Sequence, residues 1–403
     1  MSNNTQPEIR FPGFTEDWEQ RELSDISTKV QTKNKDREFT ETLTNSAEFG
    51  IISQNDFFDK EISNKNNIDG YYVVKPNDFV YNPRISNFAP VGPIKRNKLG
   101  RTGVMSPLYY VFSTNNIDNQ YLETYFSTSY WHKFMKLNGD SGARADRFAI
   151  RDSVFVKMPI PYPSREEQEK IGQFFEVLSN AIALQQRKLD LLKETKKGFL
   201  QKMFPKNGAK VPEIRFSGFT EDWEQRKVGD FLNESRIKGS DGSVARKMTV
   251  KLWRKGVVPK EEIYSGSSAT QYYIRKSGQF MYGKLDFLNQ AFGIVPSELD
   301  GYESTLDSPA FDIGENMNSI FLLEYVSLTR FYKYQGNLAN GSRRAKRIHV
   351  DTFLEMPIPT PSFEEQTKIG GFFKQLDDTI TLHQRKLDLL KETKKGFLQK
   401  MFV

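Results

Sequence analysis

The sequence predicts a mixed α/β (α+β) protein in which two globular domains are joined by two long antiparallel coiled-coil helices. Two segments of nineteen and fifteen residues each occur twice, the first unchanged and the second with one substitution, and short β-like runs fill the stretches between them. Repetition on this scale indicates two copies of one structural plan. We therefore expect a pseudo-twofold internal repeat with globular domains at 1–157 and 207–355 and helices at 158–206 and 356–403.

The two repeated segments define the frame of each half. Residues 186–204 return unchanged as 384–402, which is 198 positions later, and residues 7–21 return as 212–226 with a single change from proline to serine. The shorter segment places phenylalanine and tryptophan close to proline and glycine. Its aromatic side chains are expected to pack against a helix end rather than to bind a ligand.

Each long helix is expected to follow a proline-rich stretch. The motif Met-Pro-Ile-Pro at 158–161 and 356–359 excludes helix and favours an extended chain. Ser164 and Glu167 then have the spacing of a capping box, and the second copy repeats it. No helix breaker follows before Pro205, so each helix should have about 38 residues and a length of about 57 Å at ~1.5 Å per residue.

Apolar residues recur along both helices in alternating steps of four and three, which is typical of a coiled-coil seam. One alternative is an amphipathic helix that lies on its own domain. We favour pairing of the two copies, because both carry the same narrow stripe. The predicted seam consists of Ile171, Phe175, Leu178, Ile182, Leu189, Leu192, Phe199, Ile369, Phe373, Leu376, Ile380, Leu387, Leu390 and Phe397.

The globular stretches show β-branched and aromatic runs bounded by Asn, Asp, Gly and Pro, a pattern that predicts short strands. The first stretch also predicts an aromatic helix at 120–134 and a glycine-rich basic loop at 138–147. The second repeats this plan with other residues, including a basic loop at 341–347, so we expect one fold with two different surfaces. The expected strands are 49–53, 70–74, 79–81, 107–112, 272–274 and 280–282.

Composition and motifs argue against several classes of protein. The chain carries 58 Lys and Arg against 51 Asp and Glu, contains no cysteine, and has no apolar run approaching a membrane span. With no signal peptide at its start, we expect a cytoplasmic protein. Phosphate-binding, dinucleotide-binding and His-Glu-x-x-His motifs are all missing. Only His132, His349 and His383 exist, so no catalytic residue and no metal ligand is predicted.

Basic residues in loops point to nucleic acid instead. Lysine and arginine gain affinity for phosphates by counterion release, and arginine can read guanine edges. Basic loops stand at matching places in both halves, which a merely solvated loop does not require. The candidate DNA-binding residues are Tyr81, Arg84, Lys95, Arg96, Lys98, Arg101, Arg144, Arg147, Tyr282, Lys284, Arg343, Arg344, Lys346 and Arg347.

This combination resembles the specificity (S) subunit of a type I restriction–modification system. The resemblance lies in Met-Pro-Ile-Pro, the following Glu-Glu-Gln-x-Lys-Ile-Gly at 166–172 and 364–370, and the copied helix, and it covers essentially the whole chain. It implies that each globular domain is a target recognition domain that reads one half of a bipartite, asymmetric site on double-stranded DNA. The helices would set the spacer between the half-sites.

The resemblance also implies partners. The helices would dock two modification (methyltransferase) subunits, through which two restriction (translocase/nuclease) subunits join. S-adenosylmethionine, ATP and Mg would belong to those subunits, and this chain would have no cofactor and no catalysis of its own. Two alternatives remain at this point: a DNA methyltransferase in its own right, and a coiled-coil adaptor without direct DNA readout.

Overall fold

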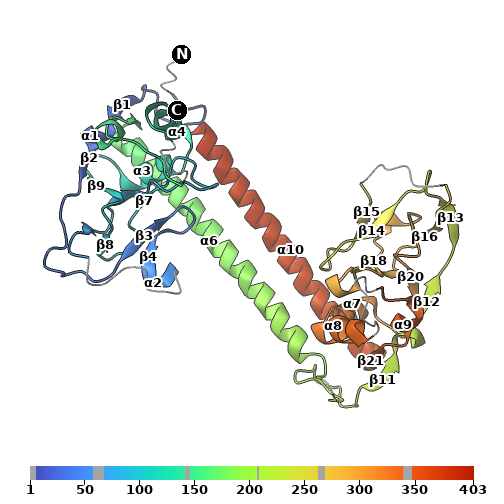
Figure 1. Ribbon diagram of the computed structural model, residues 1–403. Coiled ribbons are helices and arrows are strands. Elements are labelled where there is room, and N and C mark those ends of the chain that lie inside the picture. The colour runs from blue at the N-terminus through green and yellow to red at the C-terminus, as the bar shows by residue number, and fades with distance from the viewer. Residues whose placement is uncertain (1–5, 58–67, 141–145, 207, 262–267, 339–346) are drawn as a thin grey trace. The chain divides into compact units, whose positions relative to one another are not determined.

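A computed structural model describes residues 6–57, 68–140, 146–206, 208–261, 268–338 and 347–403 (Figure 1). The chain divides into two compact units. Unit 1 comprises Met1–Gln186 and Lys386–Val403, and unit 2 comprises Arg187–Arg385. Each unit thus combines one globular part with a portion of both long helices. Within the described residues we find no helix whose length and apolar character suit a membrane crossing.

A four-stranded antiparallel sheet with the order β2-β9-β6-β7 forms the centre of unit 1. Side chains of β6 alternate between its two faces. Phe79 and Tyr81 enter a large aromatic core, whereas Val80 enters a smaller aliphatic core. The strands are β2 (Ser27–Lys29), β9 (Tyr110–Thr114), β6 (Phe79–Tyr81) and β7 (Ile94–Arg96), with the antiparallel pairs β1 (Glu19–Glu22) and β10 (Pro159–Tyr162), β3 (Leu43–Ser46) and β4 (Gly50–Ser53), and β5 (Tyr72–Val74) and β8 (Gly103–Met105).

The helix expected at 120–134 is two helices, so that expectation was wrong in its continuity. Hydroxyl groups end the first helix: Ser127 Oγ donates to the Thr124 carbonyl at 2.6 Å and Thr128 Oγ1 to the Tyr125 carbonyl at 2.7 Å. Such bonds compete with helix continuation. The two helices are α3 (Asn119–Phe126) and α4 (Tyr130–Asn138), and the short helices of unit 1 are α1 (Leu23–Ile26), α2 (Gln54–Phe57) and α5 (Asp152–Phe155).

Unit 2 repeats this plan around a sheet with the order β12-β20-β17-β18. Phe280 and Tyr282 enter an aromatic core and Met281 a second core, as their counterparts do in unit 1. The elements are β11 (Glu224–Lys227), η2 (Val228–Asp230), β12 (Leu232–Ser235), β13 (Lys238–Asp241), β14 (Met248–Val250), β15 (Val257–Pro259), β16 (Gln271–Ile274), β17 (Phe280–Tyr282), η3 (Phe287–Asn289), β18 (Phe292–Ile294), η4 (Ser297–Leu299), β19 (Glu303–Ser304), β20 (Ala310–Ile313), α7 (Ser319–Val326), α8 (Thr329–Leu338), α9 (Val350–Leu354) and β21 (Pro357–Thr360).

The prediction of one fold in both halves is confirmed by this order of elements. The strands expected at 79–81 and 280–282 have the observed ends, and 272–274 lies in β16. Those expected at 49–53, 70–74 and 107–112 correspond to β4, β5 and β9 with ends shifted by up to three residues.

The start of each long helix is tied to the shorter repeated segment. Ser164 caps the first helix by accepting from the Glu167 backbone at 3.3 Å. The Glu167 carboxylate, however, accepts from Arg10 at 2.7 and 2.8 Å and from Trp18 Nε1 at 3.1 Å, bonds that a capping box does not include. In unit 2 the copied arginine and glutamate repeat the same ion pair at 2.7 and 2.8 Å. The helix start is therefore anchored by a contact remote in sequence.

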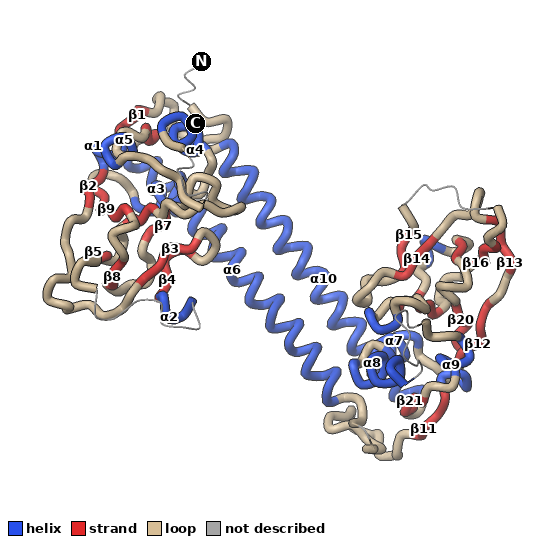
Figure 2. Tube along the Cα trace, viewed as in Figure 1, coloured by secondary structure: helices blue, strands red, loops and turns tan. Residues whose placement is uncertain are grey.

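The two long helices have the predicted length. They are α6 (Arg165–Lys202) and α10 (Phe363–Lys400), each 38 residues, and Figure 2 shows each as one uninterrupted helix. All fourteen predicted seam residues are buried or half-buried. Leucines off the seam are exposed, with 69% of Leu184 and 68% of Leu191 accessible on α6. Burial along both helices follows the predicted stripe, and Ile171, Phe175, Ile369 and Phe373 pack into the aromatic cores of the two units.

The helices pack against each other in antiparallel fashion within each unit. In unit 1 the rings of Phe174, early in α6, and Phe397, late in α10, lie 5.0 Å apart. In unit 2 the reverse holds, with Phe199, late in α6, 5.0 Å from Phe372, early in α10. The preference for pairing over a helix that lies only on its own domain is confirmed.

Each helix also completes the aromatic core in which the other helix begins. The end of α10 enters unit 1, where the ring centroid of Phe402 lies within 5.7–6.3 Å of those of Trp18, Tyr121, Tyr125 and Phe175. The end of α6 enters unit 2, where the ring centroid of Phe204 lies within 5.5–6.2 Å of those of Trp223, Phe321, Tyr325 and Phe373.

Candidate nucleic-acid interface

Two arginines lie side by side where the chain leaves the central sheet of unit 1. Arg84 follows β6, and its backbone forms an antiparallel bridge with Arg147. The bridge is held by the Phe148 N–H donating to the Pro83 carbonyl at 2.8 Å. Opposed residues in an antiparallel pair present their side chains on the same face. With Arg84 exposed and Arg147 half-buried, this edge of unit 1 presents two neighbouring cations.

Unit 2 places cations at the corresponding edge. Lys284 follows β17, and its carbonyl accepts from the Ile348 N–H at 3.0 Å, which brings Arg347 to this segment. Arg347 is exposed and forms an ion pair with Asp307 at 3.2 Å. The structure therefore brings together one pair of predicted residues in each unit. Arg147 and Arg347 occupy equivalent positions, whereas Lys284 stands where unit 1 has Pro83, next to Arg84.

Four of the predicted residues lie outside the described part of the chain: Arg144, Arg343, Arg344 and Lys346. Two others are wrong. Tyr81 is 4% exposed and donates its hydroxyl to the Val91 carbonyl, while Tyr282 is 0% exposed and donates to Ile348. Burial raises the pKa of both phenols. Side chains satisfied inside the core cannot reach a base, so these tyrosines belong to packing.

In the predicted basic run at 95–101, some side chains form ion pairs within the protein and one does not. Arg96 contacts Glu123 of α3 at 2.6 Å, and Lys98 lies 3.5 Å from the same carboxylate. Arg101 binds Glu41 through two bonds of 2.7 Å. The side chain of Lys95, on the edge strand β7, makes no hydrogen bond or ion pair with any described residue.

The loop between β6 and β7 holds a side chain that sequence reasoning missed. Phe88 is 80% exposed and borders a groove of about 300 Å³ that Arg84 also lines. In proteins that bind single-stranded nucleic acid, exposed aromatic rings beside cations stack on bases. A phenylalanine within a polar, proline-bounded loop was the signal available in the sequence.

A metal centre finds no support in the described residues, because none of their His, Cys, Asp or Glu side chains gather in groups of three or more. The site is therefore a set of cationic and aromatic side chains on loop edges. Such a set can bind phosphates and base edges.

Comparison with known proteins agrees with this geometry. Residues 15–194 and 313–392 match the family described as type I restriction modification DNA specificity domain. The MjaVIII specificity subunit of a type I restriction enzyme from Methanocaldococcus jannaschii is 24% identical over 322 residues, which cover 74% of this chain and 73% of the relative.

Two solved structures share the fold. The crystal structure of a type I restriction–modification S subunit from M. genitalium has a TM-score of 0.61 at 12% identity, with 99% of both chains covered. A second structure comes from work on the structural basis of complex assembly and conformational transition of the type I R-M system. Its TM-score is 0.51 at 14% identity, and the match covers 98% of this chain and 99% of the other. Since the family match spans most of the sequence and part of each unit, this chain belongs to the type I restriction–modification DNA specificity family as a specificity subunit.

Proposed function

We propose that units 1 and 2 each read one half of a bipartite, asymmetric site on double-stranded DNA. The observation that carries this proposal is the contrast between a copied frame and divergent surfaces. Nineteen residues that end each long helix and continue two positions past it are identical in the two halves, whereas the loops that hold Arg84 and Lys284 differ in sequence but occupy equivalent places. Phosphate contacts position such a domain, and base contacts specify the sequence. Two unlike readers on one frame suit two unlike half-sites.

An exchange of globular segments tests this proposal. Residues 22–157 are replaced by the corresponding segment of another family member, and adenine methylation is mapped genome-wide in cells that carry the chain and its partner subunits. One half-site is expected to change and the other to persist. The matched control replaces 227–355 and should change the opposite half. A change in both halves after either exchange would contradict separate reading.

The two long helices are proposed to set the spacer between the half-sites. Each continues from one unit into the other without a break. Inserting seven residues after Gln186 and after Gln384 keeps the heptad seam in register and adds ~10 Å at ~1.5 Å per residue. The mapped spacer should lengthen by about three base pairs at ~3.4 Å each. An insertion in only one helix, the control, should misalign the seam and impair folding.

The exposed faces of the same helices are proposed to dock two modification subunits. Leu184 and Leu191 are spaced by one heptad, and their copies Leu382 and Leu389 are 65% and 64% exposed. An apolar stripe left open at copied positions suits two equal partners. Replacing Leu184 and Leu382 by glutamate should reduce co-purification of the methyltransferase, whereas Glu in place of an exposed polar residue, as in Gln173→Glu, should not.

This chain is proposed to be non-catalytic and to work in the cytoplasm. Two restriction subunits would join through the modification subunits, and S-adenosylmethionine, ATP and Mg would be bound by those partners. The adaptor alternative is disfavoured, because the matched family is one of DNA specificity domains. An adaptor would instead give a complex whose retention of DNA is absent or does not change with salt concentration.

A further inference from the structure

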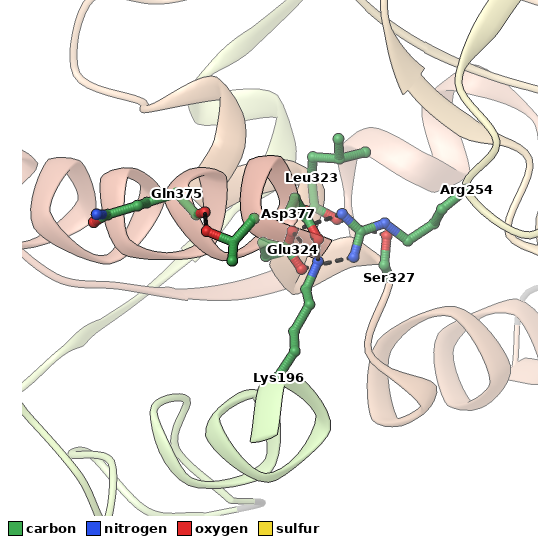
Figure 3. Close-up of polar contacts among 8 residues, drawn as sticks. Lys196, Arg254, Leu323, Glu324, Ser327, Gln375 and Asp377 are labelled. Atoms are coloured by element: carbon green, nitrogen blue, oxygen red, sulfur yellow. Dashed lines mark hydrogen bonds and ion pairs between the residues drawn. The ribbon is translucent and has the colours of Figure 1, made fainter. Parts of the chain in front are cut away.

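Lys196 and Lys394 occupy the same position in the two identical helix segments, but their surroundings differ. In unit 2 the Lys196 ammonium binds both oxygens of Asp377 at 2.6 and 2.7 Å and Glu324 at 3.1 Å. Glu324 is fully buried and also binds Arg254 through two bonds of 2.6 Å (Figure 3). These two cations and two carboxylates neutralise one another.

In unit 1 neither carboxylate is present. The place of Asp377 is taken by Ser179, whose hydroxyl donates to the Phe175 carbonyl and accepts from Lys394 at 2.8 Å. The place of Glu324, the sixth residue of α7, is taken by Thr124 in α3. Lys394 therefore has a neutral partner where its copy has two anions.

Unit 1 also adds cations at this place. Strands β7 and β18 occupy the same place in the two sheets, and their pairing puts Lys95 where unit 2 has Gly293 and Arg96 where it has Ile294. The strand is therefore basic in unit 1 and apolar in unit 2. Burial lowers the pKa of Lys394, the charge of Glu123 opposes this, and repulsion from Lys95 and Lys98 lowers the pKa further. Burial likewise lowers the pKa of Lys95.

Among the described residues, the carboxylate whose charge acts on both Lys95 and Lys394 is Glu123, and it is shared with Arg96 at 2.6 Å and Lys98 at 3.5 Å. Half-buried ammonium groups lose hydration, and an anion that binds them restores the balance. The group formed by Lys95, Lys98 and Lys394, which we call the lysine cluster, is thus a site with excess positive charge on one face of unit 1.

We propose that the lysine cluster binds a phosphodiester of the DNA backbone and so joins the end of α10 to the reading surface of unit 1. The proposal rests on the proposed DNA-reading function and adds a contact that unit 2 does not share. Lysine ammonium groups bind phosphate oxygens as point charges without requiring a fixed fork of donors. A phosphate contact places the domain along the duplex without specifying sequence.

The test measures DNA affinity of the full chain assembled with its modification subunit. The probes are a fluorescent duplex carrying the methylated site and a duplex of scrambled sequence, titrated over a range of salt concentrations. Lys394→Met should weaken binding of both duplexes about fivefold at ~0.15 M salt and reduce the slope of log affinity against log salt by about 0.9. Lys394→Arg keeps the charge and should keep the slope.

Two matched variants exploit the copied position. Lys196→Met should lower the melting temperature of unit 2 and leave the salt slope unchanged, because its ammonium is already neutralised. Ser179→Asp transplants the unit 2 carboxylate and should reduce the slope as Lys394→Met does, without unfolding unit 1.

Three results would overturn the inference. An unchanged slope in Lys394→Met and Ser179→Asp would show that no phosphate is bound. Loss of the modification subunit from Lys394→Met without DNA would assign the cluster to an acidic protein surface. An equal change of slope in Lys196→Met would remove the asymmetry. If the unmodified complex fails to prefer its methylated site, the proposed function fails instead, whatever the variants show.

Discussion

The copied end of each long helix makes the same aromatic contacts in both units but different polar contacts. The comparison shows which contacts the two halves share and which they do not. Phe204 and Phe402 enter equivalent rings of four aromatic side chains. Lys196 and Lys394, eight residues earlier, meet two carboxylates in one unit and a serine in the other. Aromatic packing requires matching shapes on all sides, whereas the polar partners of the lysine differ between the units while the aromatic packing is the same.

The aromatic half of the comparison predicts the largest effect. Phe204→Ala and Phe402→Ala each remove a fully or almost fully buried ring and should lower the free energy of unfolding by about 3–5 kcal/mol. Hydrogen exchange should show the loss in unit 2 for the first variant and in unit 1 for the second. Markedly unequal losses would mean that the two aromatic sites are not equivalent.

The polar contacts predict a loss of stability in unit 2 only. Glu324→Gln removes the charge that Lys196 and Arg254 share and should destabilise unit 2 by about 3 kcal/mol, because two cations remain without it. Thr124→Val is the matched variant in unit 1 and should change stability by less than about 1 kcal/mol. Urea unfolding with hydrogen exchange checks both, and similar losses would break the comparison.

Glu324 should also make the stability of unit 2 sensitive to acid, whereas Thr124 at the same place in unit 1 does not titrate. Burial alone raises the pKa of Glu324, but bonds and charge from Arg254 and Lys196 outweigh it, so the pKa lies below its ordinary value of 4.5. The stabilisation is therefore present above about pH 4.5 and is lost as the pH falls through the folded-state pKa. In Glu324→Gln, unit 2 should lose this acid sensitivity.

A turn before β6 predicts the opposite pH dependence in unit 1. The Lys75 N–H donates to Asp78 at 2.7 Å, and in unit 2 the neutral Gln279 accepts the corresponding bond. Burial raises the pKa of Asp78 from 3.8 to about 6, so its stabilisation is complete below about pH 4 and is lost as the pH rises through 6.

Asp78→Asn keeps the acceptor and removes this titration. It should raise the stability of unit 1 at pH 8 by up to about 3 kcal/mol and change little at pH 4. Melting curves of unit 1 across this range measure it. An equal gain at both pH values would show that charge burial is not the cause.

The smallest effect is expected where charge is exposed. Arg101 pairs with Glu41 through two bonds, which lower the pKa of Glu41, but the arginine side chain is 51% accessible. Arg101→Gln should cost at most about 1 kcal/mol, and less at high salt. DNA affinity should hardly change, because the guanidinium already has a partner. A large loss of affinity would return Arg101 to the set of DNA contacts.

Most of the frame could be predicted from the sequence, because its signals are local or repeated. The long helices follow from an uninterrupted 3.5-residue period that is copied, and the observed spans agree with it. Strands such as β6 and β17 follow from short aromatic and β-branched runs. In these segments local preference and tertiary packing agree.

The remainder depends on contacts between distant residues. Tyr81 and Tyr282 stand in strands next to loops, and only the aromatic rings packed around them show that they face the core. Arg275 is fully buried and bonded to Ser304 and Ser235 at 2.8 Å, at a position where unit 1 has the core residue Val74. No local pattern distinguishes a buried arginine from a surface one.

The placement of Phe402 sets an order of events during synthesis. The core of unit 1 includes Trp18 and Phe175, yet its last ring is that of Phe402, two residues after α10 ends. At roughly 5–20 residues per second, the ribosome adds that ring about 10–45 s after residue 175. The first half of the nascent chain therefore waits with an open aromatic cavity until the second half has been made, and a ribosome that stops early releases a chain whose first core is unfinished.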